Sequence, residues 1–442
     1  MPPRENQNSE IMKTFRTILC AVALALVAAG CEKEWDRSEW PEIPVRPDPV
    51  PNTGDYVFSG GVISEEVLHN YLSRAITQTE FLNTACTTTD GIYGTPDDER
   101  MLLNTGAKFI GRALYQWGHE EHFLDEGWFA EARAKVDRMH ASDPDLLFQA
   151  ALFEIVTAKV DDIPVPAWVF EAFGKAPEQR NFRFDAIRNE SNIKVGQWGD
   201  GTCVPDMQRE ETQMWFYYMG VKYMEAGCEA FHMGQVMLMA SMGDAANGYA
   251  GYRNLLGKLR EAARTRALRG TAIFDAHLSN GGIVVEGELL FDFVSFPLRA
   301  KEIVGEQMKA KLEKGYLDSV IGYTRGGRTP SGWSTGRVPY ILEFDNFGSS
   351  SHPGAYNWGD NFVWGYDEIS WFSRLDGEYA CQWLEYAVDY MRSVDPAGYI
   401  QMPGCRVAVD GPERFYRCNT ASEATPTGRS TEETIKRLWK NE

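Results

Sequence analysis

The chain has 442 residues, of which 43% are hydrophobic and 24% are charged. It is therefore too long and too apolar for a disordered polypeptide, and it can bury one large core. With 63 acidic and 44 basic residues, the formal charge is −19. A field of this sign repels phosphate backbones, which disfavours nucleic acid as a partner.

The N-terminal segment predicts an exported lipoprotein. Lys13 and Arg16 precede a short apolar run from Thr17 to Val27, as in a secretory signal peptide. The following Ala-Ala-Gly-Cys31 resembles the lipobox of bacterial lipoproteins. This resemblance implies a signal peptide over residues 1–30, translation starting at Met12, and lipidation of Cys31. An ordinary signal peptide that leaves Cys31 as a free thiol is the alternative.

Residues 31–55 predict an extended tether between the lipid and the folded part. The tether contains five prolines between positions 41 and 51, which keep a chain extended and solvated. Its acidic beginning resembles the surface-export signal of lipoproteins from glycan-degrading gut bacteria. We therefore expect the protein in the bacterial envelope, exposed on the outer membrane and held there only by the lipid on Cys31.

Residues 56–442 predict a single domain in which strands alternate with helices. The predicted strands are 108–117, 146–156, 229–239, 271–277, 289–296, 319–323, 338–346 and 399–402, and the predicted helices are 64–83, 123–140, 207–226, 251–268, 299–314 and 374–394. Ser64 is expected to cap the first helix. Residues 57–63 are a further candidate strand, and residues 165–173 fit either a strand or a short helix.

Eight strands alternating with helices predict an α/β fold, specifically a (β/α)8 TIM-like barrel with long loops. The connection from 277 to 289 is too short for a helix, so we expect some helices to be irregular or missing. No Gly-x-Gly-x-x-Gly motif follows an early strand. This absence disfavours a doubly wound sheet that binds a dinucleotide, and no cofactor is expected.

Six cysteines remain outside the signal peptide and Cys31. Of the possible disulfides in an oxidising compartment, Cys405 with Cys418 is the pairing that we predict. The sequence has no cysteine and histidine cluster with the spacing of a zinc site, and no structural metal is predicted.

Acidic side chains lie at the ends of several predicted strands, where a barrel of this kind carries its chemistry. Strand alternation places Ile341, Glu343 and Asp345 on one face, which directs two carboxylates into the barrel mouth. The same rule puts Asp275 and His277 on one face. Further candidates at strand ends are Glu154, Asp292 and either His232 or Gln235.

Burying so many carboxylates is costly unless they are paired or serve a site, so the set predicts a ligand site. Ion pairs with Arg112, Arg183 or Arg299 are the structural alternative for each single acid. His277 on its own is also compatible with a core or loop histidine.

A loop segment rich in aromatic residues follows the strand that carries Glu343. Glycine, serine, asparagine and aspartate place this segment in loops, where a tryptophan has no core to fill. Flat aromatic faces beside amides and carboxylates are suited to stack on pyranose rings. Trp333, Trp358 and Trp364 are therefore predicted to contact a carbohydrate. A packed lid over the barrel is the alternative.

An envelope lipoprotein with acids at strand ends and tryptophan-rich loops resembles the TIM-barrel glycoside hydrolases and hydrolase-like lipoproteins of glycan-degrading bacteria. In the large group of retaining barrel glycosidases, the acid/base glutamate ends the fourth strand and the nucleophile ends the seventh. Glu343, on the next-to-last predicted strand, matches the nucleophile. The strand at 229–239 offers only His232 and Gln235, so the acid/base position has no carboxylate.

The resemblance implies hydrolysis of an oligo- or polysaccharide by two carboxyl groups, one protonated and one ionised. Glu343 is the expected nucleophile or base, and Asp275 and Glu154 are the alternatives for the acid. Asp345, Asp292, His277 and Gln235 are expected to position the sugar. A non-catalytic glycan-binding lipoprotein on a degenerate barrel is the main alternative. A metal-dependent hydrolase using Asp275, His277 and another acid is a third possibility.

Overall fold

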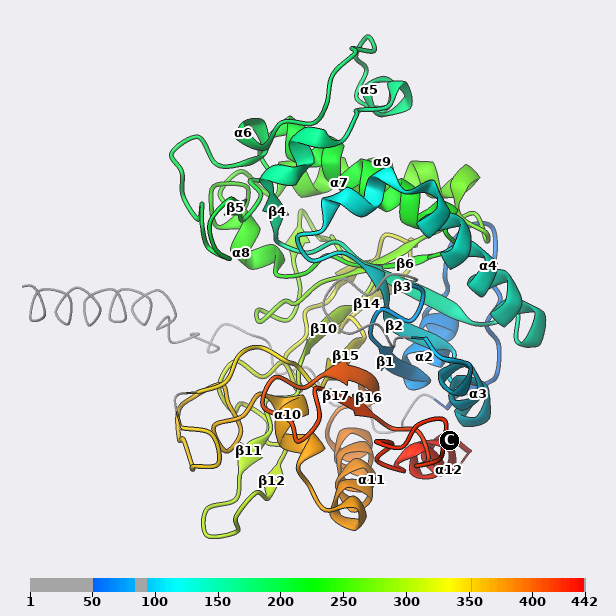
Figure 1. Ribbon diagram of the computed structural model, residues 1–442, viewed down its shortest axis with the longest axis vertical. Helices are drawn as coiled ribbons and strands as arrows, with labels where there is room; N and C mark the ends of the chain where they lie inside the picture. Colours follow the sequence, from blue (N-terminus) through cyan, green and yellow to red (C-terminus); the bar gives the residue numbers. More distant parts are fainter. Residues whose placement is uncertain (1–50, 84–93, 351, 441–442) are drawn as a thin grey trace, which may run out of the picture. The chain divides into compact units, whose positions relative to one another are not determined.

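The computed structural model describes residues 51–83, 94–350 and 352–440, which all belong to one compact unit (Figure 1). The predicted signal peptide, the lipidated Cys31 and nearly all of the tether lie outside the described residues, as does Cys86. Within the described part, no helix has the length and hydropathy needed to cross a membrane.

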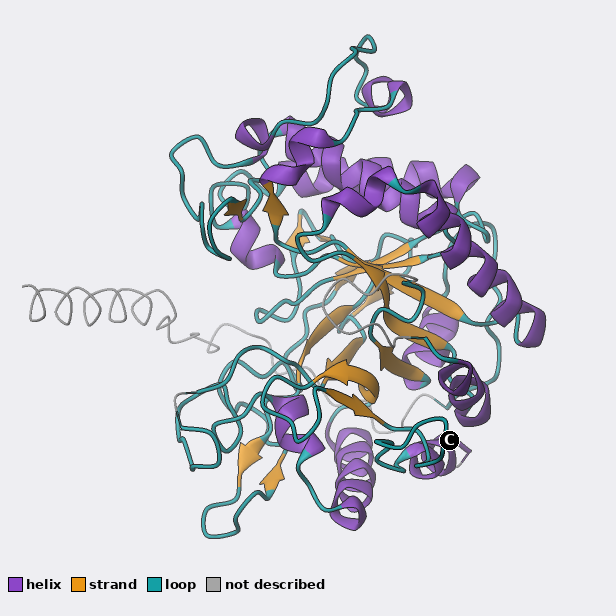
Figure 2. Cartoon of the chain, viewed as in Figure 1, coloured by secondary structure: helices purple, strands orange, loops and turns teal. Residues whose placement is uncertain are grey.

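Eight parallel strands form a nearly closed barrel, which confirms the predicted (β/α)8 TIM-like fold (Figure 2). In chain order the strands are β1 (Ala75–Gln78), β2 (Phe109–Tyr115), β3 (Leu147–Ala151), β6 (Ala230–His232), β7 (Ile273–Asp275), β10 (Val294–Pro297), β15 (Tyr340–Glu343) and β16 (Gly398–Val407). The barrel nearly closes between β7 and β10. There His277 bridges Ser295, and the Ser295 N–H donates to the Ala276 carbonyl at 3.2 Å.

Helices cover the outside of the barrel over most of its circumference (Figure 2). The longer ones are α2 (Glu65–Ser73), α3 (Pro96–Thr105), α4 (Glu126–Ser142), α7 (Glu210–Glu225), α9 (Ala250–Arg266), α11 (Gly377–Val394) and α12 (Glu432–Lys440). Short ones are α5 (Ala167–Ala172), α6 (Phe184–Ile187), α8 (Val236–Ala240), α10 (Glu368–Ser373) and the 3-10 turns η1 (Glu120–Leu124) and η2 (Ala158–Asp162). As predicted, Ser64 caps α2 by accepting the Val67 N–H.

Short strand pairs take the place of helices after the fifth and sixth barrel strands. Between β7 and β10 the chain forms β8 (Val284–Val285) and β9 (Glu288–Leu289), and between β10 and β15 it forms β11 (Lys301–Glu302), β12 (Ala310–Lys311), β13 (Gly327–Arg328) and β14 (Ser334–Thr335). Elsewhere β4 (Val156–Thr157) pairs with β5 (Thr202–Cys203), and β17 (Phe415–Arg417) pairs with β16. The prediction of missing helices is therefore confirmed.

Three predicted elements were wrong. The first barrel strand β1 lies inside the segment predicted as one helix over 64–83, because α2 ends at Ser73. Residues 319–323 form turns and no strand. Residues 299–314 form the β11–β12 hairpin, whose backbone N–H groups at Leu312 and Lys314 donate to tyrosine hydroxyls of α11. Of the two readings left open for residues 165–173, the helix is right.

The predicted Cys405–Cys418 disulfide does not form, and both side chains are buried. Cys405 pairs with Arg417 across the antiparallel β16–β17 ribbon, and Cys418 lies one residue beyond the end of β17. The two side chains are therefore out of register, so that proximity in sequence does not place the sulfurs opposite each other.

The barrel interior is layered, with an apolar floor and a polar layer above it. The floor lies near the N-terminal ends of the strands and comprises Ala75, Phe109, Leu147, Ala230, Ile273, Phe293 and Ile341. Because side chains alternate along a strand, the residue two positions further on returns to the interior. Those positions hold Thr77, Gly111, Gln149, His232, Asp275, Ser295, Glu343 and, on β16, Gln401. The C-terminal half of the interior is therefore polar.

Candidate functional site

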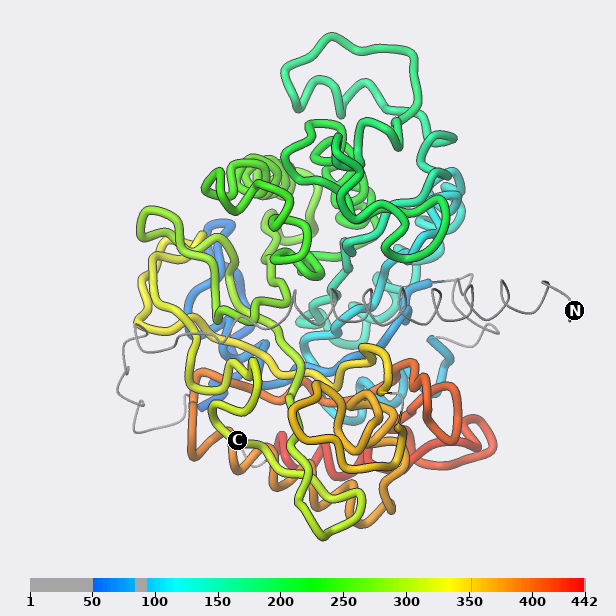
Figure 3. Tube along the Cα trace, turned by 90° about the vertical axis from the view of Figure 1, so that its left-hand side faces the viewer, coloured from blue at the N-terminus to red at the C-terminus, as the bar shows by residue number. Residues whose placement is uncertain are grey.

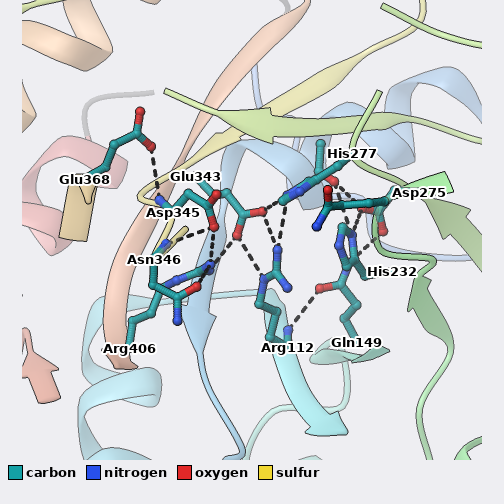
Figure 4. Close-up of polar contacts among 12 residues, drawn as sticks. Arg112, Gln149, His232, Asp275, His277, Glu343, Asp345, Asn346, Glu368 and Arg406 are labelled. Carbon is teal, nitrogen blue, oxygen red and sulfur yellow. Dashed lines mark hydrogen bonds and ion pairs between the residues drawn. The ribbon is translucent and has the colours of Figure 1, made fainter. Parts of the chain in front are cut away.

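Glu343, at the C-terminal end of the seventh barrel strand, is the centre of a buried charge cluster (Figure 4). One oxygen, Oε1, accepts from Arg112 Nη2 at 2.5 Å and from His277 Nε2. The other oxygen, Oε2, accepts from Arg112 Nε at 3.0 Å and from Arg406 Nη1 at 2.6 Å. Since a carboxylate offers about four lone-pair sites, these four hydrogen bonds occupy all of them.

The cluster keeps Glu343 ionised although the side chain is only 1% exposed. Burial on its own raises the pKa of a carboxyl group. Here the positive charges of Arg112 and Arg406, with the hydrogen bond from His277, outweigh burial and hold the pKa of Glu343 well below its ordinary value. Glu343 is thus a fixed anion, the form needed of a nucleophile or base.

Arg406, on the last barrel strand, joins Glu343 to Asp345. Its Nη2 donates to Asp345 Oδ1 at 2.8 Å, while its Nη1 binds Glu343. A single guanidinium therefore spans both carboxylates, as the alternation of the strand predicted when it placed them on one face. Asp345 is the more open of the two, with a side chain 13% exposed.

Glu368, the first residue of α10, fixes the backbone around this cluster. Its carboxylate accepts the backbone N–H groups of Leu298, Arg299 and Asp345 at 3.1, 2.5 and 3.1 Å. Burial raises the pKa of Glu368 to about 7, against the opposing effect of Arg299. The carboxylate thereby connects the backbone segments that follow β10 and β15.

Arg112 reaches Glu343 from a strained backbone position. Its φ of +56° lies in the left-handed region, and the β2–β3 register shifts between Ile110 and Leu114, as at a β-bulge. The Arg112 N–H donates to Gln149 Oε1 at 2.9 Å, which stabilises the bulge. Strain of this kind costs about 1–3 kcal/mol and is concentrated at functional sites.

His277 occupies the outer edge of the cluster. It lies two residues beyond Asp275, on the same side of the chain. Its side chain is 14% exposed, in contrast to the enclosed Glu343. Nε2 lies between Glu343 Oε1 and Arg112 Nη2, the latter at 3.2 Å. A guanidinium can only donate and a carboxylate can only accept, so the shorter contact to Glu343 assigns the proton to Nε2.

Asp275 is held deeper in the barrel by three neighbours. It accepts from Gln149 Nε2 at 2.6 Å and from Ser295 Oγ at 2.6 Å, and it lies 2.8 Å from His232 Nδ1. Burial raises the pKa of Asp275 to about 7, although Ser295 and Arg112 oppose the shift. Burial and the charge of Arg112 lower the pKa of His232 well below its ordinary value.

These directions define a neutral imidazole whose Nδ1 shares a hydrogen bond with Asp275. His232 Nε2 is buried without a hydrogen-bond partner among the described residues, and the same holds for Gln401 Nε2. A Cβ on Gly111 would lie 1.9 Å from that Gln401 nitrogen, so the glycine makes room for the amide inside the barrel. The polar layer thus retains hydrogen-bonding capacity for water or a ligand.

Glu154 and Gln235 form a separate pair. The Glu154 carboxylate accepts the Gln235 backbone N–H at 3.0 Å and its Nε2 at 2.7 Å. Neither side chain contacts Glu343 or Asp275 in the described structure. A carboxyl group that serves as acid must share a cleft with its partner. Of the two candidates, Asp275 is linked to the Glu343 network, because Gln149 hydrogen-bonds both Asp275 and the Arg112 N–H.

Asp292 lies outside the barrel interior, contrary to its predicted role in positioning a sugar. Its carboxylate accepts the Phe274 N–H at 2.9 Å and contacts Arg260 of α9 at 3.2 Å. Burial raises the pKa of Asp292 against the effect of Arg260. The inward position on this strand belongs to Ser295, because the interior alternation passes through Phe293 and Ser295.

The three predicted tryptophans lie in different environments. Trp333 packs against the apolar floor and donates Nε1–H to the Ile63 carbonyl, so it lies at the N-terminal end of the barrel, away from Glu343. Trp364 is buried and donates to the Lys309 carbonyl at 2.8 Å. Trp358 is 76% exposed in the loop after β15. Trp358 is therefore the most exposed of the three, while Trp333 is half-buried.

The sequence reasoning missed several residues of the cluster. Arg406, Gln149, Ser295 and Gln401 were not among the candidates, and Arg112 was considered only as a structural ion-pair partner. Gln149 is the one polar residue of β3, and Gln401 follows the apolar residues Ile400 and Tyr399 of β16; this was the signal that could have indicated them. No group of three or more potential ligands in the described ranges is arranged to hold a metal ion.

Comparison with known proteins gives structural neighbours only. No family model matches the chain, and no curated protein does. Among solved structures, the native debranching enzyme from Nostoc punctiforme aligns at 9% identity with a TM-score of 0.41, covering 84% of this chain and 80% of that one. A xyloglucan-specific β-1,4-glucanase from a ruminal metagenomic library aligns at 10% identity with a TM-score of 0.40, covering 84% and 94%.

A family 5 glycoside hydrolase from Prevotella bryantii, in complex with a xyloglucan tetradecasaccharide, aligns at 10% identity with a TM-score of 0.37, covering 84% and 97%. In other matches the chain spans about half of the matched protein, as with 47% of an α-galactosidase from Thermus thermophilus and 53% of another structure of the debranching enzyme. The structural neighbours are thus glycoside hydrolases at low identity, and the likeness concerns the barrel fold.

Proposed function

We propose that the protein is a glycoside hydrolase that acts on an oligo- or polysaccharide at the bacterial envelope. The observation that carries the proposal is an ionised Glu343 at the end of the seventh strand, within a polar layer at the catalytic end of the barrel. Glu343 is the ionised carboxylate, acting as nucleophile or base. Asp345, bridged to it by Arg406, and Asp275, whose raised pKa keeps a proton near neutral pH, are the carboxyl groups available for the second role.

The exposed Trp358 supports a carbohydrate substrate. It lies in the loop that follows the Glu343 strand, together with Phe347 and Phe362, whose rings stack with centroids 5.9 Å apart. Aromatic faces in an exposed loop suit the apolar faces of pyranose rings. Charged groups at the strand ends suit their hydroxyl groups.

The test is a screen of the full-length protein, purified in detergent, against plant and host glycans. We expect the wild type to release new reducing ends from one glycan class. Glu343→Gln keeps the size of the side chain and removes its charge. It should lower the rate at least about 1,000-fold, which corresponds to an increase of about 4 kcal/mol in the free energy of activation. Undiminished hydrolysis by the folded variant would refute the proposed role of Glu343.

Glycan binding without turnover is the second candidate, and two observations favour it. All four lone-pair sites of Glu343 are engaged, and the fourth strand β6 ends in His232 without a carboxylate. Under this alternative the wild type binds a glycan in calorimetry, yet no reducing ends accumulate. The same screen therefore separates the two functions.

Envelope attachment is proposed from the sequence of the N-terminal segment. Lipidation of Cys31 would hold the protein in the outer membrane at the cell surface. Labelling growing cells with a radioactive fatty acid tests this. Label is expected on the wild type and absent from Cys31→Ser, whereas equal labelling of both would contradict it.

A further inference from the structure

The Glu343 cluster contains one imidazole that is both held in place and open on one side. The Nε2–H of His277 donates a hydrogen bond to Glu343, while Nδ1 makes no hydrogen bond with the described part of the chain. With the proton on Nε2, Nδ1 carries a lone pair. The side chain is 14% exposed, so this lone pair is within reach of a ligand at the barrel mouth.

His232 provides an instructive contrast. The two imidazole rings meet edge to face with centroids 4.8 Å apart, but His232 is enclosed and its Nδ1 is hydrogen-bonded to Asp275. The other groups that face His277 are Arg112 from β2, Glu343 from β15 and the Phe296 ring from β10. These neighbours hydrogen-bond Nε2 or make edge-to-face ring contacts, and none of them hydrogen-bonds Nδ1.

Two further polar groups of the Glu343 cluster also have free hydrogen-bonding capacity. Arg112 binds Glu343 through Nε and Nη2, and its Nη1 has no hydrogen-bond partner within the described ranges. Asp345 Oδ1 accepts hydrogen bonds from Arg406 and from the Asn346 N–H. Its Oδ2 accepts no hydrogen bond from the described residues. Besides the buried Arg406 Nε, the cluster thus retains one donor and two acceptors without partners among the described residues, and these groups suit the hydroxyl groups of a sugar.

We propose that His277 is the ligand-contacting residue of this cluster, and that its Nδ1 accepts a hydrogen bond from a saccharide hydroxyl. Glu343 is then also a positioning residue, because its bond to Nε2 fixes the tautomer that leaves Nδ1 as an acceptor. The proposal rests on the proposed function, since it takes a carbohydrate as the ligand. It adds the atom that makes the contact and the direction of the hydrogen bond.

Diethyl pyrocarbonate, which modifies accessible unprotonated imidazole nitrogens, tests the proposal on the full-length protein. Mass spectrometry should find His277 modified and the buried His232 unmodified, with the exposed His352 as the positive control for labelling. A pool of gluco-, manno-, xylo- and galacto-oligosaccharides should then protect His277 and leave His352 labelled. An unreactive His277 would overturn the proposal.

Two variants separate the ring nitrogens. His277→Gln keeps an amide near the position of Nε2 and loses the group at Nδ1, whereas His277→Asn keeps a polar group near Nδ1 and loses the contact with Glu343. We expect His277→Gln to fold like the wild type and to bind the oligosaccharide at least about tenfold more weakly, with a smaller loss for His277→Asn. In ¹⁵N NMR of the wild type, the His277 resonances should show a protonated Nε2 and a bare Nδ1.

The failures of the two proposals are distinguishable. If no oligosaccharide binds in calorimetry, the proposed function is refuted and the His277 contact with it. If an oligosaccharide binds but neither protects His277 nor loses affinity for His277→Gln, the carbohydrate function stands and the His277 contact is refuted.

Discussion

Replacing Glu343 by glutamine is expected to destabilise the fold strongly, because it leaves buried guanidinium groups without their anion. Glu343 accepts three hydrogen bonds from Arg112 and Arg406 and one from His277, all in the barrel interior. Arg406 keeps Asp345 as a partner, but Arg112 has no second carboxylate in hydrogen-bond contact within the described residues. Removing one partner of a buried ion pair costs about 3–5 kcal/mol.

Urea unfolding followed by circular dichroism measures this cost, with the slope of the transition checked for constancy between variants. Glu385→Gln is the matched control. It removes one charge from an exposed pair with Arg437 on the helical surface, where no more than a marginal loss of stability is expected.

A double-mutant cycle with Arg112→Met tests whether the cost arises from the pair itself. Glu343→Gln leaves Arg112 without its anion, and Arg112→Met leaves Glu343 with Arg406 as its remaining arginine partner. The double variant removes both charges of the Arg112–Glu343 pair. The double variant should therefore be less destabilised than the sum of the singles by about 1–3 kcal/mol. Additive effects, or a Glu343→Gln cost no larger than that of the control, would refute the reasoning.

Three further predictions follow from other parts of the site. Because burial raises the pKa of Asp275 to about 7, the folded state binds a proton that the unfolded state releases near pH 4; stability should therefore fall as pH rises from about 4 to about 7, by up to about 4 kcal/mol. Urea unfolding at several pH values should show a flatter profile for Asp275→Asn, and an unchanged profile would contradict the assignment. Gly234→Ala should cost about 1–3 kcal/mol, because Gly234 has φ +61° and a Cβ there would lie 2.2 Å from Glu154 Oε2. Gly257→Ala in α9, where a Cβ meets nothing within 4 Å, should instead stabilise the protein by about 0.5–1 kcal/mol; equal effects would show that the space at Gly234 was misjudged. Trp358→Ala should leave the melting temperature unchanged and weaken oligosaccharide binding about tenfold, or about 1.4 kcal/mol, whereas Trp364→Ala should cost about 3–5 kcal/mol of stability because Trp364 is buried. Unaltered binding by Trp358→Ala would exclude its face from the ligand site.

The barrel could be predicted from the sequence because seven of its strands are short apolar runs that stand apart from helical patterns. The strand β1 could not, since Ala75–Gln78 follows α2 after a single residue and the combined segment reads as one long helix. The hairpin at Lys301–Lys311 was missed for a different reason. Backbone N–H groups after the hairpin donate hydrogen bonds to the hydroxyls of Tyr386 and Tyr390, which are more than 70 residues later in the chain. The local sequence pattern cannot indicate such distant contacts.

The site was predictable where strand alternation alone decides direction. Alternation correctly placed Glu343 with Asp345 on one face, because β15 is regular up to Glu343. It did not reveal Arg112, whose side chain reaches Glu343 only because a β-bulge rotates the backbone to φ +56°. It also misplaced Asp292. The prediction directed the even-numbered residues of this segment into the barrel, whereas Phe293 and Ser295 are the residues that face the interior. Partners from distant strands, such as Arg406, become visible only when the barrel closes.

The structure of a complex with an oligosaccharide selected by the glycan screen tests the central claim most directly. The account predicts a sugar ring at the C-terminal ends of the strands, with hydroxyl groups hydrogen-bonded to His277 Nδ1, Arg112 and Asp345 and with Trp358 on its apolar face. A sugar bound elsewhere on the protein, with the Glu343 cluster untouched, would contradict it.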